Sequence, residues 1–350
     1  MKVRKVMILV SILLFWIFIL GGCQKKAETF SVFEEESIDD IKKQSEPKVI
    51  ILTHSELENS LTHEIALRFK RTLEKDHSDE FEVEIYPNNT LGSLTDGVEY
   101  FSNGAVEMRL GSGPSKIISI LKWIPSVTEI DTGELNDSLK PGHKLRNLVD
   151  EECKNYNCKI IGMTPLIYRM VTSNEEITSK DDFSKINIRV MSNGISKKYW
   201  EALGARTDSF NIEQVYVALQ QNIVDSQENT VPSIASNRLF EVQKYLTITK
   251  HMLNNDVLYI NLDFYNSLSR EQQVFIEKAA EEAIDYGTSK VTAYLLEGYK
   301  KLEAAGVEVN GLPEEEMKKM KDTVKPIVSD YLKNMYGDEL YEKVLMTIGN

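Results

Sequence analysis

The spacing of apolar and polar residues changes several times in the first third of the chain. A continuous apolar run at 48–53 predicts a buried strand, and apolar residues four positions apart over 61–73 predict one face of a helix. Apolar residues alternate over 81–85, as in a strand. A second helix over 94–101 and a strand over 105–110 follow. This strand–helix–strand–helix–strand order predicts a lobe built on a doubly wound α/β sheet.

In the remaining two thirds of the chain, the helix-like and strand-like spacing of apolar residues is less regular. The segment 117–140 has no clear period, and a helix is expected over 137–153. A second lobe is expected to begin with a strand at 168–172, and the entirely polar segment 226–230 predicts a turn. The other expected elements are strands at 159–163, 187–191 and 307–309, strands returning toward the first lobe at 245–249 and 257–262, helices through 199–203 and over 213–221 and 269–304, and closing helices from Pro313 and Gly337.

The N-terminal segment has the pattern of a targeting signal. Three cationic residues among the first five precede an apolar run at 6–20, which ends in Gly21-Gly22-Cys23. This order resembles a bacterial lipobox, so residues 1–22 are expected to be a signal peptide and Cys23 to carry lipid. An uncleaved anchor helix is the alternative. Either way the folded part is expected outside the cytoplasm, attached to a membrane through the flexible acidic tether 23–46.

Composition narrows the class of ligand. Hydrophobic residues make up 42% of the chain and charged residues 27%, as in an ordinary soluble protein. The net charge of −13 argues against nucleic acid, although a pocket can still bind an anion through its own few charges. Cys153 and Cys158 lie close in the sequence, so a disulfide and two free thiols are both open. They have no neighbouring ligands for a metal, and no cofactor-binding motif is present.

Arg189 is the strongest candidate for a binding residue. It stands between Ile188 and Val190 in a strand-like run, so alternation places it on the opposite face from them. An arginine fixed on a strand offers a rigid fork of donors that matches a carboxylate. Arg169 and Asn229 join it as candidates. From spacing alone, each of the three also has a structural interpretation: a surface ion pair for Arg169, a bridge to an acid in its own lobe for Arg189, and a turn residue for Asn229.

Several motifs occur together in the order and spacing of one family. They are Arg169-Met170-Val171-Thr172-Ser173-Asn174, Ile186-Asn187-Ile188-Arg189-Val190, Trp200-Glu201-Ala202-Leu203-Gly204-Ala205, Val215-Tyr216-Val217-Ala218-Leu219-Gln220, Val224-Asp225-Ser226-Gln227-Glu228-Asn229 and Phe240-Glu241-Val242-Gln243-Lys244-Tyr245-Leu246. From Lys48 onward the chain resembles the solute receptors of tripartite ATP-independent periplasmic (TRAP) transporters.

The resemblance implies a fold, a ligand and a partner. The fold would be α/β, with two periplasmic-binding-protein-like lobes joined by crossing hinge strands and a long helix over both. The lobes are expected to comprise residues 47–166 with 255–294, and residues 167–254 with 295–350. The ligand would be an organic acid held in the cleft. Arg189 matches the arginine that binds its carboxylate, with Arg169 and Asn229 assisting. The closed receptor would dock on a membrane permease and do no chemistry on the ligand.

The sequence also departs from that family. Ile212 stands where an aromatic residue usually packs on the ligand, and residues 130–135 replace a run that is normally apolar and aromatic. His54 is a candidate first-lobe contact, with a buried structural histidine as the alternative. The ligand is therefore expected to differ from the usual four-carbon dicarboxylates. A ligand-binding sensor and the receptor of an ATP-driven importer are the alternative functions, and no acid–base or nucleophile pair indicates an enzyme.

Overall fold

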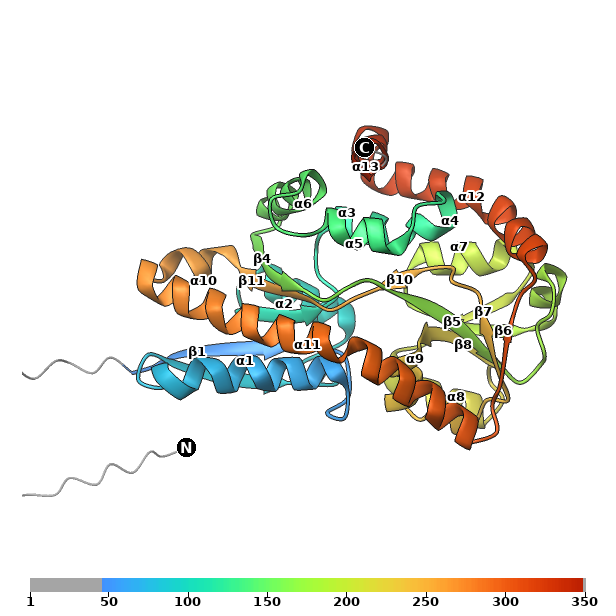
Figure 1. Ribbon diagram of the computed structural model, residues 1–350, viewed down its shortest axis with the longest axis horizontal. Coiled ribbons are helices and arrows are strands. Elements are labelled where there is room, and N and C mark those ends of the chain that lie inside the picture. The colour runs from blue at the N-terminus through green and yellow to red at the C-terminus, as the bar shows by residue number, and fades with distance from the viewer. Residues whose placement is uncertain (1–45, 349–350) are drawn as a thin grey trace, which may run out of the picture. The chain divides into compact units, whose positions relative to one another are not determined.

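The computed structural model describes residues 46–348, which contain two β-sheets (Figure 1). The first sheet has the strand order β2-β1-β3-β11-β4. The strand β1 runs parallel to its neighbours β2 and β3, whereas β11 runs antiparallel to β3 and β4. The strands are β1 (Lys48–Thr53), β2 (Phe81–Tyr86), β3 (Met108–Gly111), β4 (Cys158–Met163) and β11 (Val257–Asn261).

The helix α1 shows why the first lobe folds as it does. Ser60 caps it, because its side chain accepts a hydrogen bond from the backbone N–H of His63. Apolar residues at helical spacing, including Phe69 and Leu73, are then buried against the sheet residues Ile50 and Leu52. Two short helices, α2 and α10, also belong to this lobe. The bounds are α1 (Leu61–His77), α2 (Leu94–Ser102) and α10 (Leu262–Ser267).

The second sheet has the strand order β12-β9-β5-β8-β6-β7, with the short β10 paired to β5. Its strand β6, which carries Arg189, runs parallel to β7 and β8. The strands are β5 (Ile167–Ser173), β6 (Asn187–Val190), β7 (Arg206–Ser209), β8 (Ser226–Thr230), β9 (Tyr245–Ile248), β10 (Leu253–Asn254) and β12 (Glu308–Gly311). The helices are α7 (Gly194–Ala202), α8 (Ile212–Gln220) and α9 (Val231–Ser236), with 3-10 turns at Lys180–Lys185 and Leu239–Glu241.

The polar segment 226–230 is a strand, and the expected turn is wrong. All five residues of β8 are buried. Their side chains find partners inside the protein: Gln227 donates to Thr172 Oγ1 over 2.8 Å, and Glu228 pairs with an arginine of β5. Because partners satisfy most of these groups, with Gln227 Oε1 an exception among the described residues, a polar sequence can form an interior strand. The strand β9 also departs from expectation, since it lies in the second sheet.

The segment 117–140, which has no clear period, forms three helices, and α6 follows it. The expected single helix over 137–153 is wrong, because α5 ends at Ser138 and α6 begins at Lys144. Pro141 lacks a backbone N–H and Gly142 has φ of +86°, so the chain turns between them. The C-terminal helices pack against this region. The bounds are α3 (Lys116–Lys122), α4 (Ile124–Val127), α5 (Thr132–Ser138), α6 (Lys144–Lys154), α12 (Glu314–Tyr336) and α13 (Asp338–Ile348).

Cys153 and Cys158 are buried free thiols in this structure. The Sγ of Cys158 donates to the backbone carbonyl of Cys153 over 3.2 Å. The hydrogen bond to Cys153 and burial raise the pKa of the Cys158 thiol, so this thiol stays protonated inside the first lobe.

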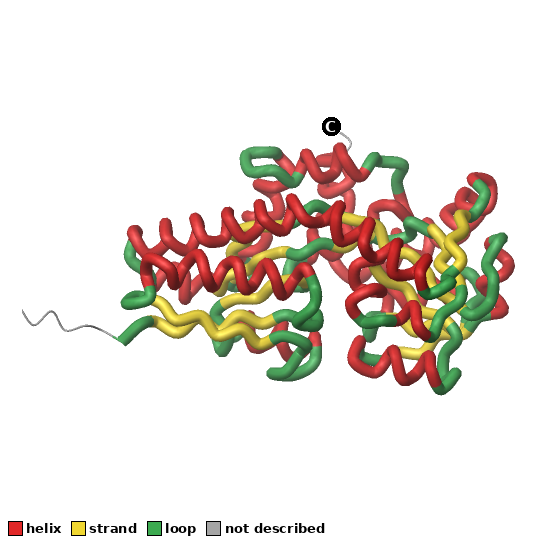
Figure 2. Tube along the Cα trace, turned by 60° about the horizontal axis from the view of Figure 1, so that its bottom comes forward, coloured by secondary structure: helices red, strands yellow, loops and turns green. Residues whose placement is uncertain are grey.

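The expected long helix is present as α11 (Arg270–Ala304), which contacts both lobes (Figure 2). Glycine allows the close approach at each contact. A Cβ on Gly287 would lie 2.5 Å from Ile65 Cδ1 of α1, and a Cβ on Gly298 would lie 2.7 Å from Val231 Cγ1 of α9. None of the helices within residues 46–348 has the length and apolar character needed to cross a membrane. The expected signal peptide, Cys23 and most of the tether lie outside the described residues.

Candidate functional site

The two lobes are joined by crossing segments and also touch across the space between them. The chain leaves the first sheet after Met163 and enters the second at Ile167, then returns between Asn254 and Val257. Three of the side-chain hydrogen bonds between the lobes join loops of the first lobe to α8 and α9 of the second. They are Ser233 Oγ to Glu56 Oε2 at 3.2 Å, Asn59 Nδ2 to the Ser236 carbonyl at 3.1 Å and Asn89 Nδ2 to Glu213 Oε1 at 2.7 Å.

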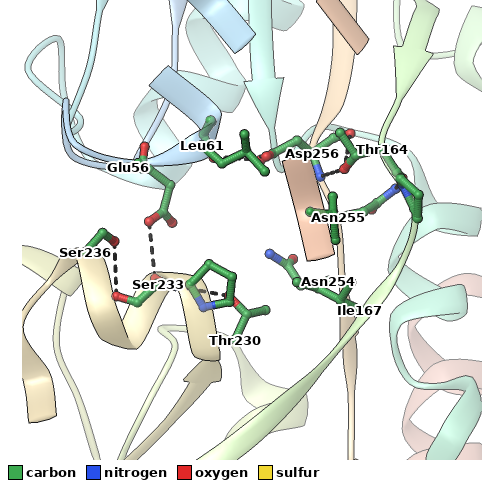
Figure 3. Close-up of a pocket in the computed structure, with 15 residues that line it drawn as sticks. Glu56, Leu61, Thr164, Ile167, Thr230, Ser233, Ser236, Asn254, Asn255 and Asp256 are labelled. Atoms are coloured by element: carbon green, nitrogen blue, oxygen red, sulfur yellow. Dashed lines mark hydrogen bonds between the residues drawn. The ribbon is translucent and has the colours of Figure 1, made fainter. Parts of the chain in front are cut away.

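A small cavity of about 60 Å³ lies where the crossing segments meet α1 and α9. Figure 3 shows Glu56 extending from the first lobe toward Ser233 at the N-terminal end of α9. The cavity is much smaller than the roughly 300–1,000 Å³ of ordinary ligand pockets. It therefore has room for one end of a small organic molecule. The lining residues used below are Glu56, Thr62, Thr164, Ser233, Asn255 and Asp256.

Arg189 is a buried cation without a carboxylate partner. Its side chain is 4% exposed, while its neighbours Ile188 and Val190 lie in the hydrophobic core. Nε and Nη2 both donate to the backbone carbonyl of Phe210, at 2.9 and 2.5 Å. Within residues 46–348, Nη1 has no hydrogen bond and the guanidinium forms no ion pair. Burial lowers the pKa of Arg189 to about 10, so the group is charged at neutral pH and lacks a counter-ion.

Arg169, by contrast, is already paired inside the second lobe. Its Nη2 donates to the carbonyl of Glu228 at 2.8 Å and to Oε1 of the same residue at 3.0 Å. His251 Nε2 lies 3.1 Å from Glu228 Oε2, and its other ring nitrogen lies 2.8 Å from Thr249 Oγ1. Burial would raise the pKa of Glu228, but Arg169 and the His251 hydrogen bond lower it to about 2. Glu228 therefore holds Arg169 in a fixed orientation beside Arg189.

The other three candidates occupy different surroundings. Asn229 lies on β8, and its Oδ1 accepts from the Thr230 N–H at 2.9 Å. His54 is fully buried in the first lobe, with Nε2 3.0 Å from His63 Nδ1. Burial, His63 and the nearby Arg109 lower the pKa of His54 to about 3, so its ring is neutral. Ile212 begins α8 and is half-buried against the second-lobe core.

The structure adds charged residues that the sequence did not single out. Glu56 and Asp256 line the cavity, and Lys122 is close enough to influence the charge of Asp256. Burial lowers the pKa of Lys122 to about 8, with Arg169 contributing. Arg109 is 1% exposed and, among the described residues, forms no ion pair. These are single charges in two loops, a helix and a strand, so no spacing in the sequence marks them as one group.

Two α/β lobes joined by crossing segments, with a buried unpaired arginine on the second sheet, are the architecture of a solute-binding protein. The chain belongs to the family described as bacterial extracellular solute-binding protein, family 7, whose characteristic sequence matches residues 52–334. Members of this family bind solutes outside the cytoplasm. Family and fold together confirm the expected two-lobed solute-binding protein.

Individual relatives match over most of the folded part. The ectoine-binding periplasmic protein TeaA of Halomonas elongata is 28% identical over 293 residues, which is 82% of this chain and 85% of TeaA. An uncharacterised Haemophilus influenzae protein is 28% identical over 217 residues, which span 61% of this chain and 65% of that relative. The crystal structure of a TRAP periplasmic solute-binding protein from Haemophilus influenzae with bound L-gulonate is 25% identical. It superposes with a TM-score of 0.75 over 86% of this chain and 98% of that one.

Proposed function

We propose that this protein captures a carboxylate-bearing organic acid between its lobes and delivers it to a TRAP-type membrane transporter. One observation carries the proposal: Arg189 is a buried guanidinium with no carboxylate partner in the described part of the chain. A buried charge without a counter-ion is costly, and a ligand carboxylate would supply one. Ectoine and L-gulonate, named for two of the relatives, both carry a carboxylate.

The candidate site residues take different parts in this proposal. The hydrogen bonds to Phe210 fix the Arg189 fork, leaving Nη1 for the ligand. Arg169, held by Glu228, adds positive charge nearby, and Asn229 on the same strand as Glu228 supplies an amide. Ile212 would border the ligand from α8. His54 would act through its packing beside Arg109, because its ring is buried.

Closure of the lobes would complete the site. We assign residues 47–166 and 255–294 to the first lobe and residues 167–254 and 295–350 to the second. The ligand would meet the second lobe first, and the inter-lobe bonds of Glu56, Asn59 and Asn89 would then hold the closed form. A ligand stabilises that form by its differential affinity for it.

Attachment and delivery complete the proposal. Cleavage after residue 22 would leave Cys23 to carry lipid, and residues 23–46 would tether the lobes to the membrane surface. The closed receptor would dock on the permease subunits and release the acid unchanged. The protein would therefore act as a carrier and not as an enzyme.

A thermal-shift screen tests the proposal on the chain lacking residues 1–23. The panel contains dicarboxylates, sugar acids, keto acids and zwitterionic acids, each beside its neutral amide, and every compound is repeated on Arg189→Ala. An acid should raise the melting temperature of the wild type, its amide should not, and the variant should lose the effect, because a ligand that binds only the folded form stabilises it. An acid that stabilises both proteins equally would contradict the arginine clamp.

A further inference from the structure

The cavity at the lobe junction is rich in hydrogen-bond acceptors. Glu56 reaches it from the loop before α1, and Asp256 from the segment that returns to the first sheet (Figure 3). Within residues 46–348, the Glu56 carboxylate accepts one hydrogen bond, from Ser233 Oγ. The Asp256 carboxylate accepts from Thr62 Oγ1, at 3.1 and 3.0 Å. Two carboxylates offer many more acceptor positions than these hydroxyls fill.

Asn255 adds a third acceptor, and this one is unsatisfied. The residue is 5% exposed and lines the cavity. Its Nδ2 donates to the Thr164 carbonyl at 3.0 Å, which fixes the amide plane. Its Oδ1 is buried and has no hydrogen-bond partner in the described part of the chain. A buried acceptor without a donor is rare and destabilising, so the site favours a donor from outside the protein.

The cavity also lacks a positive charge. No lysine, arginine or histidine nitrogen within residues 46–348 pairs with Glu56 or Asp256, and Arg169 and Lys122 influence them only from a distance. Burial and the neighbouring Asp256 raise the pKa of Glu56 to about 7, and burial raises the pKa of Asp256 to about 6. Both raised pKa values reflect the missing positive charge, because a cation in the cavity would lower them again.

The size of the cavity and its place relative to Arg189 define what would fit. About 60 Å³ is several times smaller than an ordinary ligand pocket, which suits a charged nitrogen group and excludes a whole organic acid. Arg189 on β6 is in register with Gln227 of β8, and Thr230 at the end of β8 lines the cavity, so Arg189 lies on the strand next to the one that reaches the cavity.

We propose that this cavity binds the cationic nitrogen of a zwitterionic ligand whose carboxylate lies against Arg189. Glu56, Asp256 and Asn255 accept charge-assisted hydrogen bonds from that nitrogen. The inference rests on the proposed function and names the class of acid within it. Glu56 then discriminates among acids, because a ligand without the nitrogen leaves its carboxylate unpaired.

Matched ligand pairs test the inference by titration calorimetry on the chain lacking residues 1–23. Each zwitterion is compared with an analogue in which oxygen replaces the cationic nitrogen: L-proline with tetrahydrofuran-2-carboxylate, and γ-aminobutyrate with γ-hydroxybutyrate. Ectoine, L-gulonate and succinate extend the range of sizes. The variants are Glu56→Gln, which keeps the shape and removes the charge, and Asn255→Ala. The control Glu58→Gln removes an exposed carboxylate two residues away.

The outcomes separate the inference from the proposed function. We expect the tightest ligand to be a zwitterion, to bind at least tenfold more tightly than an acid lacking the nitrogen, and to lose that preference in Glu56→Gln and Asn255→Ala but not in Glu58→Gln. If the tightest ligand is an acid without a cationic nitrogen, and Glu56→Gln binds it equally well, the inference is wrong while loss of binding in Arg189→Ala still supports the proposed function. Binding that survives Arg189→Ala, or no binding by any acid, overturns both.

Discussion

Oε1 of Glu228 lies 3.0 Å from Nη2 of Arg169, and both side chains are almost fully buried in the second lobe. The charge of Arg169 is therefore met inside the protein, whereas the charge of Arg189 on the adjoining part of the sheet is not. A ligand carboxylate would therefore stabilise Arg189 more than Arg169, because Arg189 has no charged partner among the described residues.

Breaking this buried pair should destabilise the fold strongly. Glu228→Gln leaves Arg169 uncompensated, and we expect the free energy of unfolding in urea to fall by about 3–5 kcal/mol. The matched control is Glu241→Gln, which breaks the exposed ion pair with Arg238 and should cost less than about 1 kcal/mol. Equal losses in the two variants would mean that Arg169 finds another partner when Glu228 is neutral.

Ligand affinity should depend on the shape of the Arg189 side chain as well as on its charge. Arg189→Lys keeps a cation but loses the planar fork, so we expect the dissociation constant of the best acid to rise at least tenfold, or by about 1.4 kcal/mol or more. The control Arg206→Lys changes an exposed arginine on the neighbouring strand β7. Calorimetry on both variants measures the effect, and an unchanged constant for Arg189→Lys would show that the fork is not used.

Stability should vary with pH through Glu56. Because the pKa of Glu56 is raised from 4.5 to about 7, the folded chain keeps a proton that the unfolded chain releases between these values. The contribution of this group to stability is present below pH 4.5 and is lost as the pH rises to about 7. Glu56→Gln does not titrate, so it should gain stability over the wild type by about 1–3 kcal/mol across this window.

Urea unfolding at several pH values measures that difference. Asp256, Arg169 and Glu213 influence Glu56, and Ser233 donates a hydrogen bond to it. All four remain in the variant, so subtracting the two stability curves isolates Glu56. A difference that stays flat from pH 4.5 to 7.5 would show that Glu56 keeps its ordinary pKa.

The contact between Asn89 and Glu213 should favour the closed form. Asn89 has φ of +52°, so Asn89→Gly removes the side chain without straining the backbone. We expect ligand affinity to weaken by a few-fold, about 1 kcal/mol or less, and the ligand-free radius of gyration from X-ray scattering to increase. Asn88→Gly, at the same backbone conformation one residue earlier, is the control. Equal behaviour of the two variants would exclude this contact as a closing bond.

The sequence predicted the elements that bury apolar faces and failed where polar groups are buried. Periodicity located β1, α1 and α11, because each presents one apolar side to the core. It missed β8, in which Gln227 and Glu228 are buried with partners distant in the chain, Thr172 and Arg169. Pro141 and Gly142 lie between α5 and α6, so the helix expected over 137–153 is interrupted there.

The candidate site likewise contains residues that the sequence predicted and residues that it did not. Arg189 stood out because one charged residue between two buried apolar ones needs a reason to be there. Glu56, Asn255 and Asp256 come from two loops about 200 residues apart, so only folding brings them to one cavity. The internal pairing of Arg169 was equally hidden, since its partner belongs to the segment expected to be a turn.

The helix α11 limits where the lobes can pivot. Gly287 allows it to pack closely on α1, Gly298 allows it to pack closely on α9, and each of these two contacts is too tight for an added Cβ. The two glycines are 11 residues apart, or roughly 16 Å along the helix axis. If both contacts stay intact while the cleft opens, the helix itself must bend between them. The lobes would then pivot where this helix bends, and the crossing strands would follow its motion.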